Sequence, residues 1–359
     1  MRRSISIALV TALLIFGTST SSQAAIKFTT AASAIEKSAC KPTSEISLSK
    51  SGPLFCTKGI WTLMPKSKDN VSTHAYRTII ERYNSKSDAT PKLSVHLDPL
   101  AGNWKNGIVK SINVAARLWG TSTESEKTIP IYVSETSSYI SENLSSDGIT
   151  ESQADRDRNK EAASRGGGQA GFHGQYFDFI FSEKTSKSTG YYQAGSHEYT
   201  HYSQMVFSQY RSTQGLKEFW INEGCASYIG MSLGGLIGFP QNQRTELINY
   251  LKRQQKPAKL TLFSQQDEKL YSNAHFNEIF DTGAVACEAL VAIAGVNSLE
   301  NYFRALAQTD STPESVFPEV FGTSLPSMIA LLQQYVDSVR SGHEMSFNQL
   351  NQGFEKIKI

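Results

Sequence analysis

The sequence predicts an α+β protein in which strands and helices alternate in the amino-terminal half and helices dominate the carboxyl-terminal half. Two patterns favour this class. Before about residue 190, short alternating apolar runs separate segments whose apolar residues recur at helical spacing. After that point the pattern becomes mostly helical. Apolar residues form 39% of the 359 residues, which is enough to bury a core and excludes a globally disordered chain.

Residues 1–24 have the organisation of a secretory signal peptide. Arg2 and Arg3 precede an apolar run over residues 5–16, and the small side chains of residues 22–24 suit a signal peptidase. The run is shorter than the roughly 20 residues of a comfortable membrane span. We therefore expect export to the extracellular space or the cell envelope, with no stable membrane insertion after cleavage. An uncleaved anchor is the alternative.

The charge balance argues against nucleic acid as a partner. The chain has 35 Lys and Arg residues against 33 Asp and Glu residues, so loss of a leader with Arg2 and Arg3 leaves 33 of each sign. A dedicated nucleic-acid binder normally carries a basic excess. The sequence does not indicate the oligomeric state.

Residues 25–66 are predicted to form a small amino-terminal extension. They are rich in Ser, Thr and Lys, and β-prone pieces occur at residues 46–48 and 60–64. A disulfide between Cys40 and Cys56 could staple this extension, because it would close a short loop between two strand-like runs.

Four cysteines in an exported chain allow three pairings. If Cys40 pairs with Cys56, then Cys225 pairs with Cys287. The alternative for Cys225 and Cys287 is that both are small buried residues on helices.

Residues 67–190 are predicted to form an α/β lobe. Helical spacing, as in Ala75, Ile79 and Tyr83, marks its helices, and alternation of β-forming residues marks its strands. Residues 145–171 are polar and glycine-rich near their end, so we expect a loop whose charges face solvent. In order, the expected elements are a helix over 71–83, a strand over 93–97, a helix over 108–119, a strand over 129–133, a short helix over 136–144, the loop, and a strand over 176–181.

Residues 191–359 are predicted to form a helical lobe that binds the metal discussed below. Apolar residues three and four apart mark its helices. The expected helices cover residues 192–209, 218–233, 242–254, 280–294, 298–308 and 325–340.

Residues 197–201 read HEYTH, an HExxH motif. In a chain with 7 His this motif is expected by chance about 0.01 times. On a helix, His197 and His201 lie on one face and can bind one zinc ion at about 2.0–2.1 Å each. Glu198 is one step round the helix, where it can reach a zinc-activated water as the general base. The alternative is a buried structural pair of histidines.

Zinc in a hydrolase usually takes three protein ligands and one water. The residues directly after His201 lack the Gly and His that a metzincin would need. Glu223 follows, with 21 residues between, which is long enough for a turn and a returning helix. Its neighbours Trp220 and Ile221 indicate a buried strip, where an unpaired carboxylate would be costly. We therefore predict Glu223 as the third ligand of a single Zn²⁺ per chain; the alternative is an acid on a helix surface.

HEYTH followed by WINEGCASYIG resembles the gluzincin metallopeptidases, and most closely the peptidase-MA-like branch of secreted bacterial proteins, over residues 197–230. The resemblance implies a thermolysin-like catalytic fold, with the zinc helix between an upper α/β lobe and a lower helical lobe. It also implies a zinc metallopeptidase that acts on a peptide or protein substrate. The strand over 176–181 would take the place of the family's edge strand, which pairs with substrate.

One position departs from this family. The transition-state tyrosine would match Phe280, which has no hydroxyl. Another donor substitutes, oxyanion stabilisation is weak, or the match is displaced by some residues. Tyr271, His275 and Tyr228 are the candidate donors nearby in sequence, although each also suits a packing role. Residues 166–171 lack the aminopeptidases' Met-Glu-Asn ending, so trimming from a free amino terminus is not supported.

The expected mechanism is zinc-assisted hydrolysis, in which Glu198 takes a proton from water and passes it to the leaving amine. The first alternative, favoured by Phe280, is a catalytically weak or inactive zinc-binding pseudopeptidase that binds a peptide or a partner. A cell-wall amidase is a second, although nothing resembles a glycan-binding repeat. An adhesive or structural secreted protein would contain no zinc. The substrate, endo- versus exo-cleavage and any pro-segment are left open.

Overall fold

The computed structural model describes a protein of the α+β class. The predicted signal peptide, residues 1–24, lies outside the described residues. Those residues are 28–29, 37–39, 46–49, 52–57, 59–63, 70–86, 91–102, 104–121, 128–165, 167–182, 191–209, 218–234, 243–253, 259–263 and 276–359.

The main sheet has four strands in the order β5-β6-β8-β7. Strands β5, β6 and β8 run parallel to one another, whereas β7 pairs antiparallel with β8. In the register, Val95 lies opposite Ile131, and Val133 lies opposite Phe179. Three of the strands, β5, β6 and β8, match predicted ones, and the apolar residues of β6 and β8 are largely buried. The bounds are β5 Leu93–Leu97, β6 Ile129–Ser134, β7 Gly167–Phe172 and β8 Phe177–Phe181.

The prediction that residues 176–181 form an edge strand is wrong. All five residues of β8 are buried, and β8 lies between β6 and β7. The two edges among the described strands are β5 and β7, and β7 lies in a segment that we expected to be a loop. Helix α4 (Gln153–Ser164) lies in the same segment. Its Ser152 cap accepts a hydrogen bond from the backbone N–H of Asp155, which starts a helix that has almost no apolar residues.

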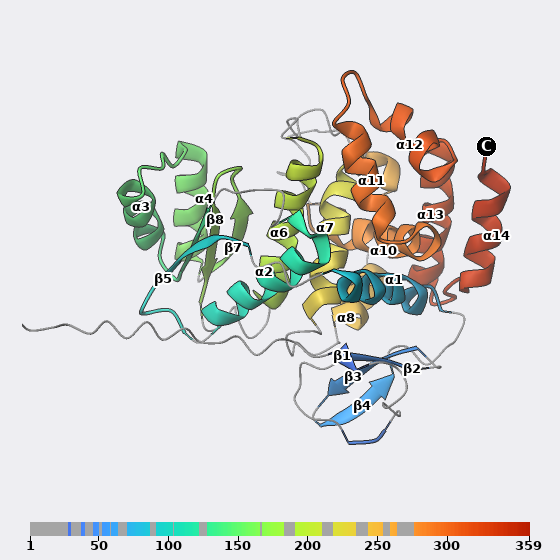
Figure 1. Ribbon diagram of the computed structural model, residues 1–359, viewed down its shortest axis with the longest axis horizontal. Coiled ribbons are helices and arrows are strands. Elements are labelled where there is room, and N and C mark those ends of the chain that lie inside the picture. The colour runs from blue at the N-terminus through green and yellow to red at the C-terminus, as the bar shows by residue number, and fades with distance from the viewer. Residues whose placement is uncertain are drawn as a thin grey trace, which may run out of the picture.

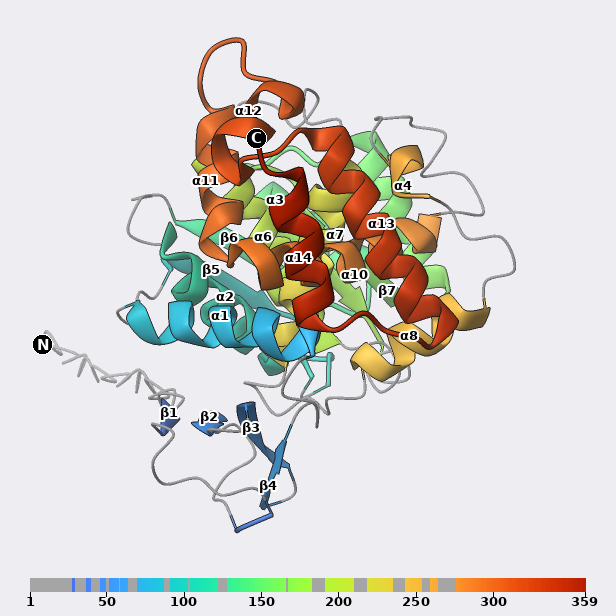
Figure 2. The same cartoon turned by 90° about the vertical axis from the view of Figure 1, so that its right-hand side faces the viewer.

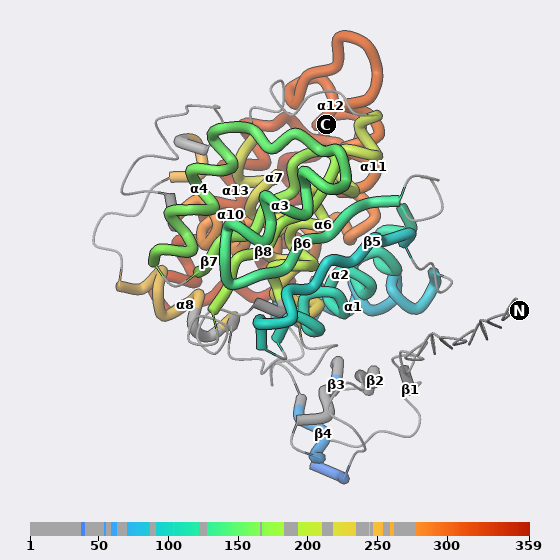
Figure 3. Tube along the Cα trace, turned by 90° about the vertical axis from the view of Figure 1, so that its left-hand side faces the viewer, coloured from blue at the N-terminus to red at the C-terminus, as the bar shows by residue number. Residues whose placement is uncertain are grey.

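Helices cover both faces of this sheet (Figures 1 and 3). Helices α3 (Ser137–Ser146) and α4 lie on one face, over a small core that includes Tyr132, Leu144 and Ile180. Helices α2 (Lys105–Trp119) and α6 (Tyr191–Phe207) belong to the main core on the other face, with Phe177 and Phe179. Since α6 carries the HExxH motif, the sheet supports the motif from one side.

The carboxyl-terminal lobe is helical, as predicted (Figure 2). Helix α7 packs against α6, and α10 packs against α7 and α1. Within the described part of this lobe, two helices were not predicted, α12 and α14. Each begins at a capping box, formed by Thr312 with Ser315 and by Ser346 with Gln349. The bounds are α1 Val71–Ser85, α7 Phe219–Gly234, α8 Gln243–Arg253, the 3₁₀ turn η4 Leu260–Phe263, α10 Phe276–Ala294, α11 Asn297–Leu306, α12 Pro313–Phe321, α13 Leu325–Ser341 and α14 Phe347–Ile357.

No single helix of the described part of the chain is long and apolar enough to cross a membrane. The bent pairs α10–α11 and α12–α13 reach that length and composition when the two helices of each pair are taken together.

A second, smaller sheet lies beside this body (Figure 1), with β3 against α1. Its strand order is β1-β2-β3-β4, with β1 parallel to β2 and the other pairs antiparallel. The predicted Cys40–Cys56 disulfide involves Cys40, which lies outside the described residues. The bounds are β1 Phe28–Thr29, β2 Ile46–Ser49, β3 Gly52–Thr57 and β4 Ile60–Leu63.

Candidate metal centre

Small residues and buried hydroxyls hold α6 tightly against α2. A Cβ on Gly195 would lie 2.1 Å from Ser111 Oγ and 2.5 Å from the carbonyl oxygen of Ile108, so only glycine fits this crossing. The indole Nε1 of Trp119 donates a hydrogen bond to Thr200 Oγ1 at 3.0 Å. These contacts fix the rotation of α6 about its axis, and with it the direction of the two motif histidines.

Helix α7 is held on the other side of α6 by equally close contacts. A Cβ on Gly230 would lie 2.9 Å from the Gln193 carbonyl oxygen and 3.4 Å from His197 Cβ. Nearer the start of α7, a disulfide joins Cys225 to Cys287 of α10, with Cα atoms 5.2 Å apart. Glu223 is two residues before this cross-link, so its backbone is anchored to both neighbouring helices.

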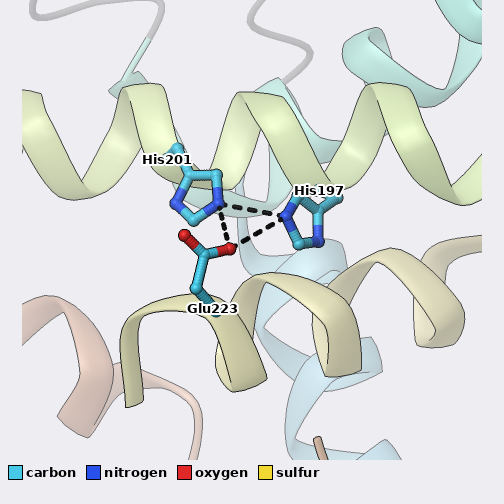
Figure 4. Close-up of side chains that lie close together, drawn as sticks. All are labelled: His197, His201 and Glu223. Atoms are coloured by element: carbon cyan, nitrogen blue, oxygen red, sulfur yellow. Dashed lines mark hydrogen bonds and ion pairs between the residues drawn. The ribbon is translucent and has the colours of Figure 1, made fainter. Parts of the chain in front are cut away.

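The three predicted ligands come together between α6 and α7 (Figure 4). His197 Nε2 lies 3.0 Å from His201 Nε2. Glu223 Oε2 lies 3.1 Å from His201 Nε2 and 3.4 Å from His197 Nε2. Ligands bound at 2.0–2.1 Å to a tetrahedral zinc ion are about 3.3–3.4 Å apart. Two imidazoles and one carboxylate at this spacing therefore fit one zinc ion, with a fourth position for water.

The outer nitrogen of each imidazole also has a partner. His201 Nδ1 lies 2.9 Å from Gln204 Oε1, and His197 Nδ1 lies 3.3 Å from Ser227 Oγ. Such contacts orient histidine ligands and leave Nε2 for the metal. Sequence reasoning missed Gln204 and Ser227. Gln204 lies three residues after His201 and Ser227 lies four residues after Glu223, so each shares a helix face with a predicted ligand, and this spacing could have revealed them.

The electrostatics suit a cation. Burial would raise the pKa of Glu223, but the two imidazoles, His201 foremost, hold that pKa well below its usual range. Burial would lower the pKa of His201, but the Glu223 carboxylate outweighs it and raises the pKa to about 9. The centre thus keeps an ionised carboxylate against the histidine nitrogens, and a divalent cation can take the place of the imidazole proton.

Glu198 is 8% exposed. Burial is the main reason why the pKa of its carboxyl is raised, and His197 and His201 partly offset that effect. A carboxylate with a raised pKa beside a metal centre is suited to accept a proton.

Phe280 and Tyr228, one of the three candidate oxyanion donors, are not part of the ligand cluster. The ring of Phe280 lies 5.9 Å from that of His197, centroid to centroid, so a side chain without a hydroxyl stands beside the centre. The Tyr228 hydroxyl is hydrogen-bonded with Ser232, and burial followed by the charge of Glu288 raises the pKa of Tyr228. Tyr271 and His275 lie outside the described residues.

The chain matches no protein-family model, no curated protein and no solved structure in the three comparisons made. The gluzincin resemblance therefore stays a prediction that rests on the motifs over residues 197–230.

Proposed function

We propose that the protein is an exported zinc-dependent metallopeptidase of the gluzincin type. The observation that carries the proposal is the cluster of His197 Nε2, His201 Nε2 and Glu223 Oε2, within 3.4 Å of one another. The thermolysin-like arrangement of the fold is part of the same proposal. An α6 helix between a sheet on one side and a helical lobe on the other is consistent with it.

The chemistry follows from the side chains present. Zinc held by His197, His201 and Glu223 would acidify water and polarise a peptide carbonyl. Glu198, buried next to these ligands, accepts the proton of the attacking water and returns it to the leaving nitrogen. Ser227 and Gln204 face the Nδ1 atoms of His197 and His201, so Nε2 of each ring is left to bind the metal.

The β7 strand supplies a place for an extended peptide. Among the described strands it pairs with β8 on one side, and it contacts α6. Backbone groups along the other side of an edge strand can pair with an added strand. Residues 167–172, and not residues 176–181, therefore pair with the substrate.

Phe280 favours a second candidate function, a zinc-binding pseudopeptidase. Its ring stands beside His197, at 5.9 Å between centroids, where a tyrosine would supply a hydroxyl. Without that donor, developing negative charge on a peptide oxygen is less stabilised, and removal of one such donor typically costs about 10²–10³ in rate. In this case the same site binds a peptide or partner without cutting it.

Zinc quantitation combined with an unbiased peptide-degradation screen tests both candidates. The wild-type protein should contain one zinc per chain and cleave some peptides, whereas Glu223→Ala should lose both properties. The exposed acid Glu319 offers a matched control, and Glu319→Ala should change neither. Zinc without cleavage of any peptide would point to the pseudopeptidase. Wild-type protein without zinc would overturn both candidates.

A further inference from the structure

Gln204 connects the two helices that carry the ligands. It lies three residues after His201 on α6 and is 3% exposed. Its Oε1 atom is 2.9 Å from His201 Nδ1, and its Nε2 atom donates to the carbonyl oxygen of Asn222 at 3.1 Å. Asn222 directly precedes Glu223 on α7. One amide group therefore touches a histidine ligand on one helix and the backbone beside the carboxylate ligand on the other.

The Asn222 carbonyl settles which way this amide points. A backbone carbonyl oxygen can accept a hydrogen bond and cannot donate one, so the atom of Gln204 that faces it must be the NH₂ group. The Gln204 oxygen then faces His201 Nδ1, and that oxygen can only accept. His201 Nδ1 must therefore carry the proton. In the neutral ring the lone pair is then on Nε2, the atom that faces His197 and Glu223.

We infer that Gln204 is a positioning residue for the metal: it holds His201 in the form with the proton on Nδ1 and fixes the Asn222–Glu223 backbone against α6. The inference rests on the proposed metal centre, and does not require that the protein hydrolyse peptides. Partners of this kind typically change metal affinity by about 10- to 100-fold when they are removed.

The experiment measures zinc affinity by competition with a chelator, on the whole exported protein. Gln204→Met keeps the length and helix preference of the side chain but removes the acceptor and the donor. It should bind zinc about 10- to 100-fold more weakly than wild type. Gln204→Glu restores an acceptor for His201 Nδ1, so it should bind zinc more tightly than Gln204→Met.

Ser203→Ala is the matched control. Ser203 is the neighbour of Gln204, is 1% exposed, and its hydroxyl contacts Thr121 Oγ1 at 3.1 Å, away from the ligands. It should bind zinc as wild type does, even if it unfolds at a lower temperature. Circular dichroism at the assay temperature checks that every variant is folded.

The outcomes separate the inference from the proposed function. Wild-type affinity in Gln204→Met, or equal affinities in the Met and Glu variants, would overturn the role of Gln204. An equal loss in Ser203→Ala would overturn it too, because the effect would then follow helix stability. Zinc binding with the expected order of affinities, but without hydrolysis, would support the role of Gln204 and contradict the peptidase. No zinc in the wild-type protein would overturn the metal centre and the inference together.

Discussion

Gly224 and Gly283 meet where α7 crosses α10, and a Cβ on Gly224 would lie 2.3 Å from the carbonyl carbon of Gly283. Real Cβ atoms do not come so close to backbone, so both helices depend on the absence of a side chain here. Glu223 directly precedes Gly224. The close contact therefore helps to set the distance of its carboxylate from the histidines on α6.

Gly224→Ala should destabilise the protein by about 1–3 kcal/mol, because the added methyl meets backbone that cannot move aside. Chemical denaturation measures the loss. Gly353→Ala is the control: its Cβ would lie 2.6 Å from Leu331 Cδ1, the tip of a side chain that can rotate away. That variant should be neutral or more stable by up to about 1 kcal/mol, since alanine favours helix. Equal stability of the two variants would contradict the helix crossing described here.

Glu198→Gln should leave the zinc content unchanged and lower peptide hydrolysis by about 10²–10⁴-fold, because the amide cannot accept the proton of the attacking water. Zinc quantitation and turnover measured on the same preparation check the two halves. Retained hydrolysis in this variant would remove Glu198 from the role of base. Loss of zinc would place it among the ligands instead.

Phe280→Tyr should raise hydrolysis, by up to about 10²-fold, if the missing hydroxyl limits stabilisation of the oxyanion. A hydroxyl added to this ring would lie near the metal centre, because the centroid of the Phe280 ring is 5.9 Å from that of His197. Steady-state kinetics measure the gain, and Phe280→Leu, which changes the ring without adding a hydroxyl, should give none. No change in Phe280→Tyr would indicate that another group already serves as the donor.

His173 gives the fold a pH dependence that can be measured. Its ring nitrogens lie 3.2 Å from Asp155 and 3.0 Å from Asp178. Burial lowers the pKa of His173, but Asp178 and then Asp155 outweigh it and the opposing charge of Arg158, so the pKa is raised above 6.5. A raised pKa in the folded state means that the protonated imidazole stabilises the fold.

That stabilisation is fully present below pH 6.5 and is lost as the pH rises through the folded-state pKa of His173. Thermal unfolding from pH 6 to pH 9 should therefore show a fall in the Tm of the wild-type protein that is smaller in His173→Gln. The exposed His343 provides the control, and His343→Gln should keep the wild-type dependence. Parallel curves for His173→Gln and the wild type would exclude the contribution of His173.

The helices beside the site were predictable because apolar residues recur at helical spacing along α6 and occupy most positions of α7. The helix predicted over 192–209 is Tyr191–Phe207, and the one predicted over 218–233 is Phe219–Gly234. Helix α4 gave no such signal, because Asn159 and Ala162 are its buried residues and most of the others are charged or polar. Residues 167–172 form a strand because they pair with β8, although their glycine-rich sequence does not favour one.

The ligands of the candidate centre were predictable for a different reason. The spacing of His197 and His201 places both rings on one helix face whatever the surroundings. Glu223 could be found because apolar neighbours mark its side chain as buried. Gln204 lies three residues after His201 on the same helix, so helix spacing alone could have suggested that contact, whereas Ser227 meets His197 only where α7 packs against α6.

The Cys225–Cys287 bridge spans a sequence separation of 62 residues. A single cut of the chain inside that span would leave both fragments covalently attached, with α7 still joined to α10. Such nicked protein would run as one band on a non-reducing gel and as two bands after reduction. Preparations used for metal analysis or kinetics should therefore be inspected under reducing conditions, since self-cleavage within this span would otherwise escape notice.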